Sequence, residues 1–224
     1  MYIPEHFRVH DHAEAIAFMR ANPFAILISS APVSSTPASL NDEGANDEGP
    51  FATHLPLFVL ATDERVVLRG HVAKANPHWR YLEQNPRCLT IFHGPHAYVS
   101  ASNYVTRENV PTWNYGAVHV YGSARTFAAP EELQGMLHQL IGTFEPAYAE
   151  QWTSLSEAYR DRMLSHIVGI EITVTKIEAK FKLSQNRTKE EQANVIASLA
   201  KAEDTAISGV SRLMREQCLG DTKK

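Results

Sequence analysis

Cysteine is scarce in this chain. Its 224 residues include only two, Cys88 and Cys218. The two lie far apart and form no Cys-x-x-Cys pair, so the sequence offers neither a zinc-ribbon spacing nor a disulfide framework. Two reduced thiols are typical of a cytoplasmic protein, and the cytoplasm is the location that we expect.

Long apolar runs are also missing. No stretch approaches the roughly 20 apolar residues that a helix needs to cross a bilayer. The first residues, MYIPEHFRVHDHAEA, include early acids and lack the apolar region of a signal peptide. We therefore expect neither a membrane span nor a secretory leader.

The chain has no large excess of charge of either sign. Its formal net charge is −4, and the segment NDEGANDEGP (residues 41–50) alone holds four acids and no base. Acids and bases balance in the remainder, so nucleic-acid binding would require a local basic face. We predict that residues 33–50 form a mobile acidic loop between two strands.

The common motifs of nucleotide and metal chemistry are absent as well. There is no GxGxxG, no GxxxxGK[ST] and no HExxH. Eleven histidines are present, but none has metal-ligand spacing on a convincing helix, and no Ser–His–Asp set can be assigned. The sequence therefore predicts no metal site and assigns no catalytic residue.

Short apolar runs bounded by turn residues are plentiful. They predict about six strands and few long helices, which favours a small antiparallel barrel with helices, an α+β fold that is mainly β. The strand-like runs behind this prediction are seven, one more than the expected strand number, and cover residues 24–30, 51–60, 66–72, 87–94, 96–102, 110–128 and 167–185. The change of apolar parity within 167–185 predicts a bulge near Thr175–Ala179, and Gly94–Pro95 predicts a corner.

Helical patterns divide the chain into two predicted parts. Residues 1–187 form a barrel domain with a helical insertion at 130–165, and residues 188–224 form a helical tail. Thr188 and Glu191 have the spacing of a capping box at the start of that tail. The predicted buried stripe of its helices consists of Val195, Ile196, Leu199, Ile207, Val210 and Met214.

The stretch GHVAKANPHW (residues 70–79) joins a predicted strand to a predicted helix, with Asn76 as the predicted N-cap and Pro77 as the first helical position. Arg69 and His71 share one strand face, Lys74 follows the strand end, and Gly70 would allow a ligand close to the backbone. With the free N–H groups that follow Pro77, this corner has the donors of a phosphomonoester site. A pair of solvated cations with a locally bonded histidine is the equally simple alternative.

Two further strands contain residues that could line a flat ligand. Pro56 interrupts the run THLPLF, which indicates an edge strand whose backbone at His54 and Leu55 is free to bind. Trp113 and Asn114 begin a strand with an aromatic stripe, and such a stripe is more often core than cofactor wall. The basic segment KFKLSQNR (180–187) could touch phosphate or DNA, or simply protect a strand edge.

Taken in order, these segments resemble a known family. The chain is similar to the PaiB-type FMN-binding negative transcriptional regulators, which belong to the FMN-binding split-barrel superfamily. The resemblance covers nearly the whole chain, and its motifs are MYIPEHF, THLPL, RGHVAKANPHW, FHGPHAYVSASNY, VPTWNYGAVHVYG and KFKLSQNR.

The resemblance implies a six-stranded antiparallel split barrel that forms a homodimer and binds FMN near the subunit interface. The strand with THLPL would lie beside the isoalloxazine, the corner would receive the phosphate, and the last strand would approach the pocket. The implied cofactor-binding residues are Thr53, His54, Leu55, Arg69, Gly70, His71, Lys74, Trp113, Asn114, Gln185 and Asn186. Ala101 stands where the family commonly has proline.

The resemblance indicates the function less directly than it indicates the fold. The resemblance implies a negative transcriptional regulator, but the tail that could pass for a helix-turn-helix carries several acids that would oppose DNA phosphates. DNA is therefore a possible partner without a clear reading element. A flavin-dependent oxidoreductase acting on a small molecule and a haem-binding or haem-degrading split barrel are the alternatives.

Overall fold

The computed structural model describes residues 1–30 and 50–219. Apart from Pro50, the predicted acidic loop at 33–50 lies outside the described residues. Contacts divide the chain into two compact units, which are treated separately below. Unit 1 comprises Met1–Phe18, Phe92–His119 and Glu178–Lys224, and unit 2 comprises Met19–Ile91 and Val120–Ile177. The predicted division into a barrel domain (1–187) and a tail (188–224) stays a prediction.

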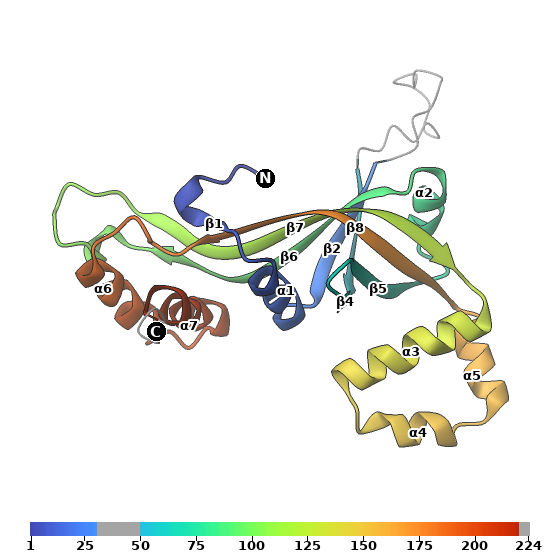
Figure 1. Cartoon of the computed structure of the whole chain (residues 1–224). Coiled ribbons are helices and arrows are strands. Elements are labelled where there is room, and N and C mark those ends of the chain that lie inside the picture. The colour runs from blue at the N-terminus through green and yellow to red at the C-terminus, as the bar shows by residue number, and fades with distance from the viewer. Residues whose placement is uncertain (31–49, 220–224) are drawn as a thin grey trace, which may run out of the picture. The chain divides into compact units, whose positions relative to one another are not determined.

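One antiparallel sheet, which is not closed, contains the strands of the described chain (Figure 1). Its order is β3-β2-β6-β7-β8-β5-β4, and β1 pairs with β8. The registers of β2 with β3 and β6, of β5 with β4 and β8, and of β1 with β8 are all antiparallel. The strands are β1 (Arg8–Val9), β2 (Phe24–Ser29), β3 (Phe51–Pro56), β4 (Phe58–Ala61), β5 (Val66–Ala73), β6 (Arg87–Val99), β7 (Thr112–Phe127) and β8 (Ile167–Lys182).

The predicted α+β class with an antiparallel, mainly β architecture is confirmed, although the strand count differs from six. The run FATHLPLFVL is divided at Leu57 into β3 and β4, which occupy opposite ends of the strand order. Because Pro56 lacks a backbone N–H, it suits the end of an edge strand. The edge position that the sequence predicted for this strand is therefore confirmed.

In unit 2 the open sheet curls, so that β5 comes close to the end of the edge strand β3 without pairing with it. A Cβ atom on Gly70 of β5 would lie 2.6 Å from the carbonyl oxygen of Pro56 and 2.8 Å from Cδ2 of Leu57. Those distances are shorter than real Cβ contacts, so only glycine lets β5 approach the β3–β4 connection this closely. This approach gives the unit its barrel character.

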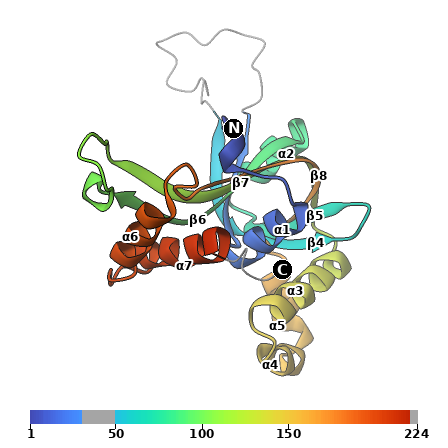
Figure 2. The same ribbon diagram turned by 60° about the vertical axis from the view of Figure 1, so that its left-hand side comes forward.

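Four helices belong to unit 2, and three of them confirm the predicted helical stretch at 130–165. They are α2 (His78–Gln84), α3 (Pro130–Phe144), α4 (Tyr148–Ser154) and α5 (Glu157–Leu164). The helix α3 lies beside the β4–β5 hairpin and α5 (Figure 2). Side chains of α3 and α5 form a buried apolar cluster with one residue of β4 and one of β7. That cluster consists of Phe58, Phe127, Leu133, Met136 and Leu164.

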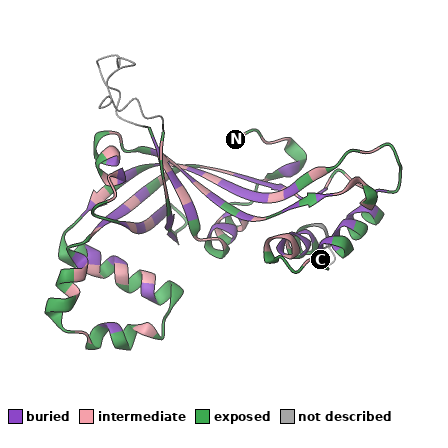
Figure 3. Ribbon diagram, turned by 180° about the vertical axis from the view of Figure 1, so that it is seen from behind, coloured by how far each residue is buried: buried purple, intermediate pink, exposed green. Residues whose placement is uncertain are grey.

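Unit 1 is built around the far halves of β6 and β7 and the end of β8. Its longer helices are α6 (Lys189–Leu199) and α7 (Thr205–Leu219), and the first residues of α1 (His12–Ala21) also belong to it. Thr188 and Glu191 form the predicted capping box. One side of α6 and α7 is buried (Figure 3), and the predicted stripe is confirmed at Val195, Ile196, Leu199, Val210 and Met214.

The predicted corner at Gly94–Pro95 is wrong, because β6 continues as one strand from Arg87 to Val99. Burial changes parity there instead: Phe92 and Gly94 are buried before the proline, and Ala97 and Val99 after it. One extra residue is thus absorbed inside the strand, as in a bulge. In β8 burial also changes parity, from Ile172 to Ala179, which agrees with the predicted slip in that strand.

Candidate functional site

The corner between β5 and α2 is fixed by a short series of hydrogen bonds. The Lys74 N–H donates to the carbonyl of His166 over 2.7 Å, and the Trp79 indole donates to the Lys74 carbonyl over 3.0 Å. The His78 N–H donates to Asn76 Oδ1 over 3.0 Å. Asn76 therefore accepts from the first N–H of α2, as expected of a capping side chain, although Pro77 holds the N-cap position and the helix begins one residue later than the sequence predicted.

Side chains from β3 and from this corner form a polar cluster inside unit 2. Thr53 Oγ1 lies 3.2 Å from Asn76 Nδ2 and 2.8 Å from His78 Nδ1. Thr53 points inward because it pairs in register with the fully buried Leu27 of β2. The cluster thus connects the edge strand β3 to the start of α2.

His78 is the unusual member of the cluster. Its side chain is 0% exposed, and its Nε2 atom has no hydrogen-bond partner within the described part of the chain. Burial lowers the pKa of His78 to about 4, so the ring is neutral near pH 7. A buried polar atom without a partner is costly, and it is expected where a ligand supplies that partner.

Lys74 adds the charge. Its side chain is exposed, and among the residues that the structure describes its ammonium forms no ion pair. Among the described residues, the corner therefore has an exposed lysine without an ion pair and a neutral, buried imidazole whose Nε2 atom has no partner.

Arg69 and His71 point away from this cluster. They alternate on β5 with Gly70, whose Cβ position faces Pro56 on the inner side. On the outer side the Arg69 Nε donates to Glu171 Oε2 over 2.6 Å, and Nη1 donates to Gln139 Oε1 of α3 over 3.1 Å. The positive charge of Arg69 is thus compensated within the protein.

His71 lies on the same outer side of β5. Its Nδ1 atom is buried and has no partner within residues 1–30 and 50–219, and burial lowers its pKa. The strand face therefore separates Arg69 and His71 from Thr53, Asn76 and His78, although the sequence placed Arg69, His71 and Lys74 in one group. Gly70 serves the packing of β5 against Pro56 instead of the approach of a ligand on that side.

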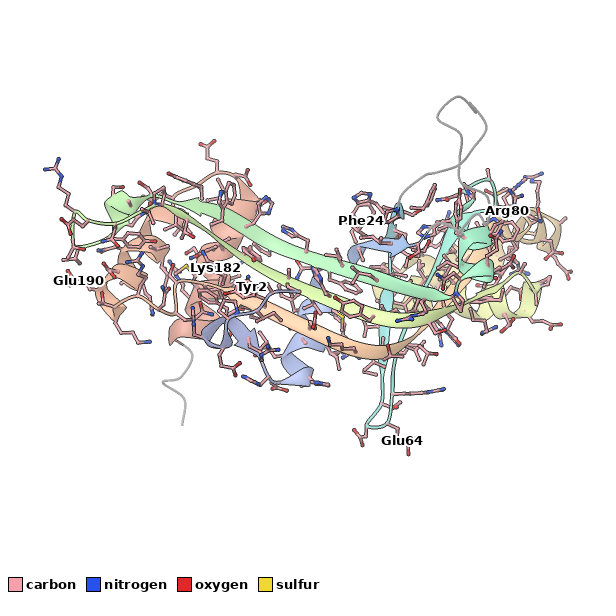
Figure 4. The ribbon with its side chains drawn as sticks, turned by 90° about the horizontal axis from the view of Figure 1, so that it is seen from above. Tyr2, Phe24, Glu64, Arg80, Lys182 and Glu190 are labelled. Carbon is pink, nitrogen blue, oxygen red and sulfur yellow. The ribbon has the colours of Figure 1, made fainter. Side chains whose placement is uncertain are left out.

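The two other predicted residues of β3 face opposite ways. Leu55 is buried in the core, whereas His54 is exposed and stacks on Phe24 with 6.0 Å between ring centroids. Phe24 is itself 64% exposed, and Figure 4 shows its position at the start of β2. The outer edge of β3 thus presents a histidine and an aromatic ring to solvent.

The two predicted residues at the start of β7 belong to unit 1 and differ sharply in solvent exposure. Trp113 is 52% exposed and contacts the rings of His96 and Tyr98, with centroid distances of 5.9 and 6.2 Å. Asn114 is 0% exposed, and its amide donates to Ser184 Oγ over 2.9 Å. A ligand could reach Trp113, while Asn114 is committed to the core of the unit.

The predicted residues after β8 also lie in unit 1. Gln185 accepts from the Leu183 N–H over 2.7 Å and donates to the Phe181 carbonyl over 2.5 Å, so its amide holds a local turn. Asn186 is exposed. Nearby, Lys182 of β8 donates to the Trp113 carbonyl over 2.6 Å, and Figure 4 marks its position.

Histidine pairs do not assemble into a metal centre in the described chain. His93 and His96 contact each other with ring centroids 4.9 Å apart, a contact that the expected corner would not have produced. No group of three or more His, Cys, Asp or Glu side chains there could hold a metal ion. The described helices also include none that is long and apolar enough to span a bilayer.

Sequence reasoning omitted two members of the cluster, Asn76 and His78, from the proposed ligands. Asn76 was interpreted only as a helix cap, and His78 received no role. The available signal was a histidine in the first turn after an Asn–Pro step at a strand-to-helix corner, where side chains and backbone donors converge.

Comparison with protein-family models matches residues 1–176 to the family described as "Putative FMN-binding domain". That match covers most of the chain. The chain belongs to this family. FMN is accordingly its cofactor, and the resemblance to the PaiB type is confirmed.

Individual relatives agree with this assignment. The chain is 36% identical over 219 residues to "Protease synthase and sporulation protein PAI 2" of Bacillus subtilis, covering 97% of this chain and 98% of that protein. Among solved structures, the FAD and heme binding protein of Mycobacterium smegmatis has a TM-score of 0.58 at 12% identity, covering 83% and 78% of the two chains. The flavocytochrome Anf3 of Azotobacter vinelandii has a TM-score of 0.52 at 15% identity, covering 86% and 78%. These structures share the fold, and the expected split barrel is confirmed.

The β5–α2 corner fits the phosphate end of FMN. A phosphomonoester needs hydrogen-bond donors and positive charge. Within the described residues, the corner has a buried imidazole nitrogen of His78 without a partner and the ammonium of Lys74 without an ion pair. The edge strand β3 ends beside it, with backbone on its outer side that no further strand of the described sheet covers.

Proposed function

We propose that this chain is an FMN-binding regulator of the PaiB type and that the FMN phosphate binds at the β5–α2 corner. The observation that carries the proposal is the vacant Nε2 of His78, which is fully buried beside Thr53 and Asn76. Lys74 supplies the charge that a phosphate dianion requires.

The hydrogen bonds of the cluster define the roles of its members. Asn76 Nδ2 can only donate, so Thr53 Oγ1 accepts from it and directs its own hydrogen toward His78 Nδ1. A neutral ring that accepts at Nδ1 carries its hydrogen at Nε2. Thr53 and Asn76 thereby prepare His78 to donate to a phosphate oxygen, and Lys74 contacts the same anion.

The isoalloxazine would lie along the edge strand β3. The backbone at His54 and Leu55 is available there because β3 ends the strand order. Trp113 and Asn186 are exposed and are the predicted residues of unit 1 that remain accessible to a ligand. Arg69, Gly70, His71, Asn114 and Gln185 would support the site through packing and internal bonds.

Titration with FMN, followed by quenching of flavin fluorescence, tests the phosphate site. We expect Lys74→Ala and His78→Gln each to weaken FMN binding by about tenfold or more, the effect of losing a charge-assisted or buried hydrogen bond. Lys201→Ala, which changes an exposed lysine between α6 and α7, is the matched control. Wild-type affinity in both corner variants would refute the assignment.

The regulatory part of the proposal rests on the relative whose name connects it with protease synthesis and sporulation. We propose a cytoplasmic homodimer. Burial raises the pKa of the Cys88 thiol to about 12, which suits an unreactive, reduced cysteine. Size-exclusion chromatography with light scattering would give a dimer mass, and a monomer at micromolar concentration would contradict it.

Direct DNA binding is the least supported part of the regulatory role. The exposed residues of α6 and α7 mix Lys189, Arg212 and Arg215 with Glu190 and Glu216. A gel shift with DNA from upstream of its own gene, at low salt and with or without FMN, decides the point. A shift that weakens with salt supports direct repression, and no shift at the lowest salt refutes it.

A further inference from the structure

A pocket of about 380 Å³ opens on the outer side of the β4–β5 hairpin in unit 2. The tip of this hairpin is marked by Glu64 in Figure 4. The pocket lies among the hairpin, the end of α1 and β8, and it contains none of the Thr53–Asn76–His78 cluster. Its lining consists of Arg20, Val59, Leu60, Ala61, Thr62, Arg65, Val67, Arg69 and Glu171.

Two of the charged groups at the pocket belong to a balanced network. Glu171 accepts from Arg69 and, over 3.4 Å, from Arg125, whose other nitrogen donates to Glu132 over 2.9 Å. Burial by itself raises the pKa of Glu171, but the hydrogen bonds and charges of Arg69 and Arg125 outweigh it and lower that pKa. Two arginines and two glutamates thus neutralise one another.

The other two arginines of the pocket are not neutralised. Arg20 donates one long bond, 3.4 Å from Nη2 to the Val59 carbonyl. In the portion of the chain that the structure describes, neither Arg20 nor Arg65 forms an ion pair. Each guanidinium carries five N–H donors, so within the described residues most of the donors of Arg20 and Arg65 have no acceptor.

Apart from Thr62, the remaining lining is apolar. Val59 and Val67 are buried, and Leu60 and Ala61 continue the same hairpin at the pocket. The volume lies within the usual range of small-molecule sites, about 300–1,000 Å³. An apolar lining with two free guanidinium groups suits a ligand that has a compact apolar body and a doubly charged anionic head.

We propose that this pocket binds a small organic dianion of the phosphomonoester class, in addition to the flavin at the corner. Arg20 and Arg65 bind the phosphate oxygens, and the β4–β5 hairpin receives the apolar group. The site is separate from the flavin corner, because Arg69 and the inward-facing Gly70 lie on opposite faces of β5.

Isothermal titration with phenyl phosphate tests the proposal on protein already saturated with FMN, so that the corner is occupied. We expect one site, weaker binding of benzoate, which carries a single charge, and none of benzyl alcohol. Arg65→Gln and Arg20→Gln should each lower the affinity for phenyl phosphate by about tenfold, as expected for a charge-assisted pair. Arg212→Gln, on the exposed side of α7, should match wild type.

Glu171→Gln should increase the affinity for phenyl phosphate, whereas misfolding of a variant would only decrease it. It removes the one acid that lines the pocket and releases Arg69, so phenyl phosphate should bind several-fold more tightly. Absence of binding to the FMN-saturated protein, or equal binding by wild type, Arg65→Gln and Arg20→Gln, would overturn the proposal. Binding that disappears in Lys74→Ala instead would show that the probe occupies the flavin corner.

Discussion

The polar residues that the sequence singles out behave differently in the two units. In unit 1, Asn114 and Gln185 donate and accept within the protein itself, to Ser184, Leu183 and Phe181. In unit 2, His71, which the sequence singled out, and His78, which it did not, each keep one ring nitrogen buried and without a partner among the described residues. A polar group whose bonds are complete holds a fold together, whereas a buried one with a vacant atom indicates a ligand.

The positively charged side chains show the same contrast between groups with and without partners in the described chain. Arg69 is neutralised by Glu171, while Lys74 at the corner and Arg20 and Arg65 at the hairpin pocket form no ion pairs within the described residues. Sequence reasoning treated Arg69 and Lys74 alike. Their partners in the folded chain, not their residue types, separate a structural cation from one available to an anion.

The largest expected effect is a loss of folding stability at acid pH, caused by His78. Its folded pKa of about 4 lies below the ordinary value of 6.5, so the unfolded state takes up the proton first as the pH falls. Stability is complete above pH 6.5 and is lost between about pH 6.5 and 4, by about 3 kcal/mol at most. Urea unfolding across this range should show a smaller loss in His78→Gln, and an identical acid loss in both proteins would contradict this assignment.

The same urea unfolding, repeated with FMN bound, tests whether the phosphate contacts His78. A phosphate beside His78 favours the imidazolium form and should raise its pKa, so saturation with FMN should reduce the acid loss in wild type. If FMN leaves the wild-type profile unchanged, the phosphate does not contact this ring.

A somewhat smaller effect is expected at the closure of the barrel in unit 2. Gly70→Ala places a Cβ atom 2.6 Å from the Pro56 carbonyl and should destabilise the protein by about 2–3 kcal/mol through overpacking. Gly135→Ala on α3 is the matched control, since nothing lies within 4 Å of its Cβ position. That control should be stabilising by about 0.5–1 kcal/mol, and a comparable loss in both variants would refute the close approach.

Asn114→Ala tests the completed bonds of unit 1. Loss of the bond to Ser184 inside a fully buried site should lower the free energy of unfolding by about 2 kcal/mol, while FMN affinity stays at the wild-type value. Thermal unfolding and flavin titration check the two parts. A folded variant that loses FMN would show that Asn114 acts at the cofactor and would remove the contrast between the units.

The smallest effect is expected from an exposed ion pair. Arg125 and Glu132 are both about half exposed, with side-chain exposures of 49% and 46%. Their pair lies in solvent that screens its charges, so Glu132→Gln should change stability by less than about 1 kcal/mol. Urea unfolding at low and high salt measures it, and a loss above 2 kcal/mol would mean that the network around Glu171 is more cooperative than its exposure indicates.

Much of this architecture could be predicted from the chain alone. The edge position of THLP follows from Pro56, the start of α2 from Asn76, and the capping box from Thr188 and Glu191, because each depends on neighbours a few residues away. The buried stripe of α6 and α7 follows from helical spacing. The prediction of a corner at Gly94–Pro95 was wrong because a glycine–proline step occurs both in turns and in bulged strands, and the sequence does not distinguish the two.

The sequence by itself determined the family, the flavin cofactor, the antiparallel sheet and the position of the strand-to-helix corner. These depend on local patterns and on ordered motifs along the chain. Only the tertiary structure decided which side chains of that corner converge. The inward turn of Thr53, the burial of His78 and the pairing of Arg69 with Glu171 depend on strands more than a hundred residues apart or on opposite faces of one strand. A hydrogen-bonding atom with a partner and one without differ only in what lies beside them, and those neighbours come together only in the folded chain.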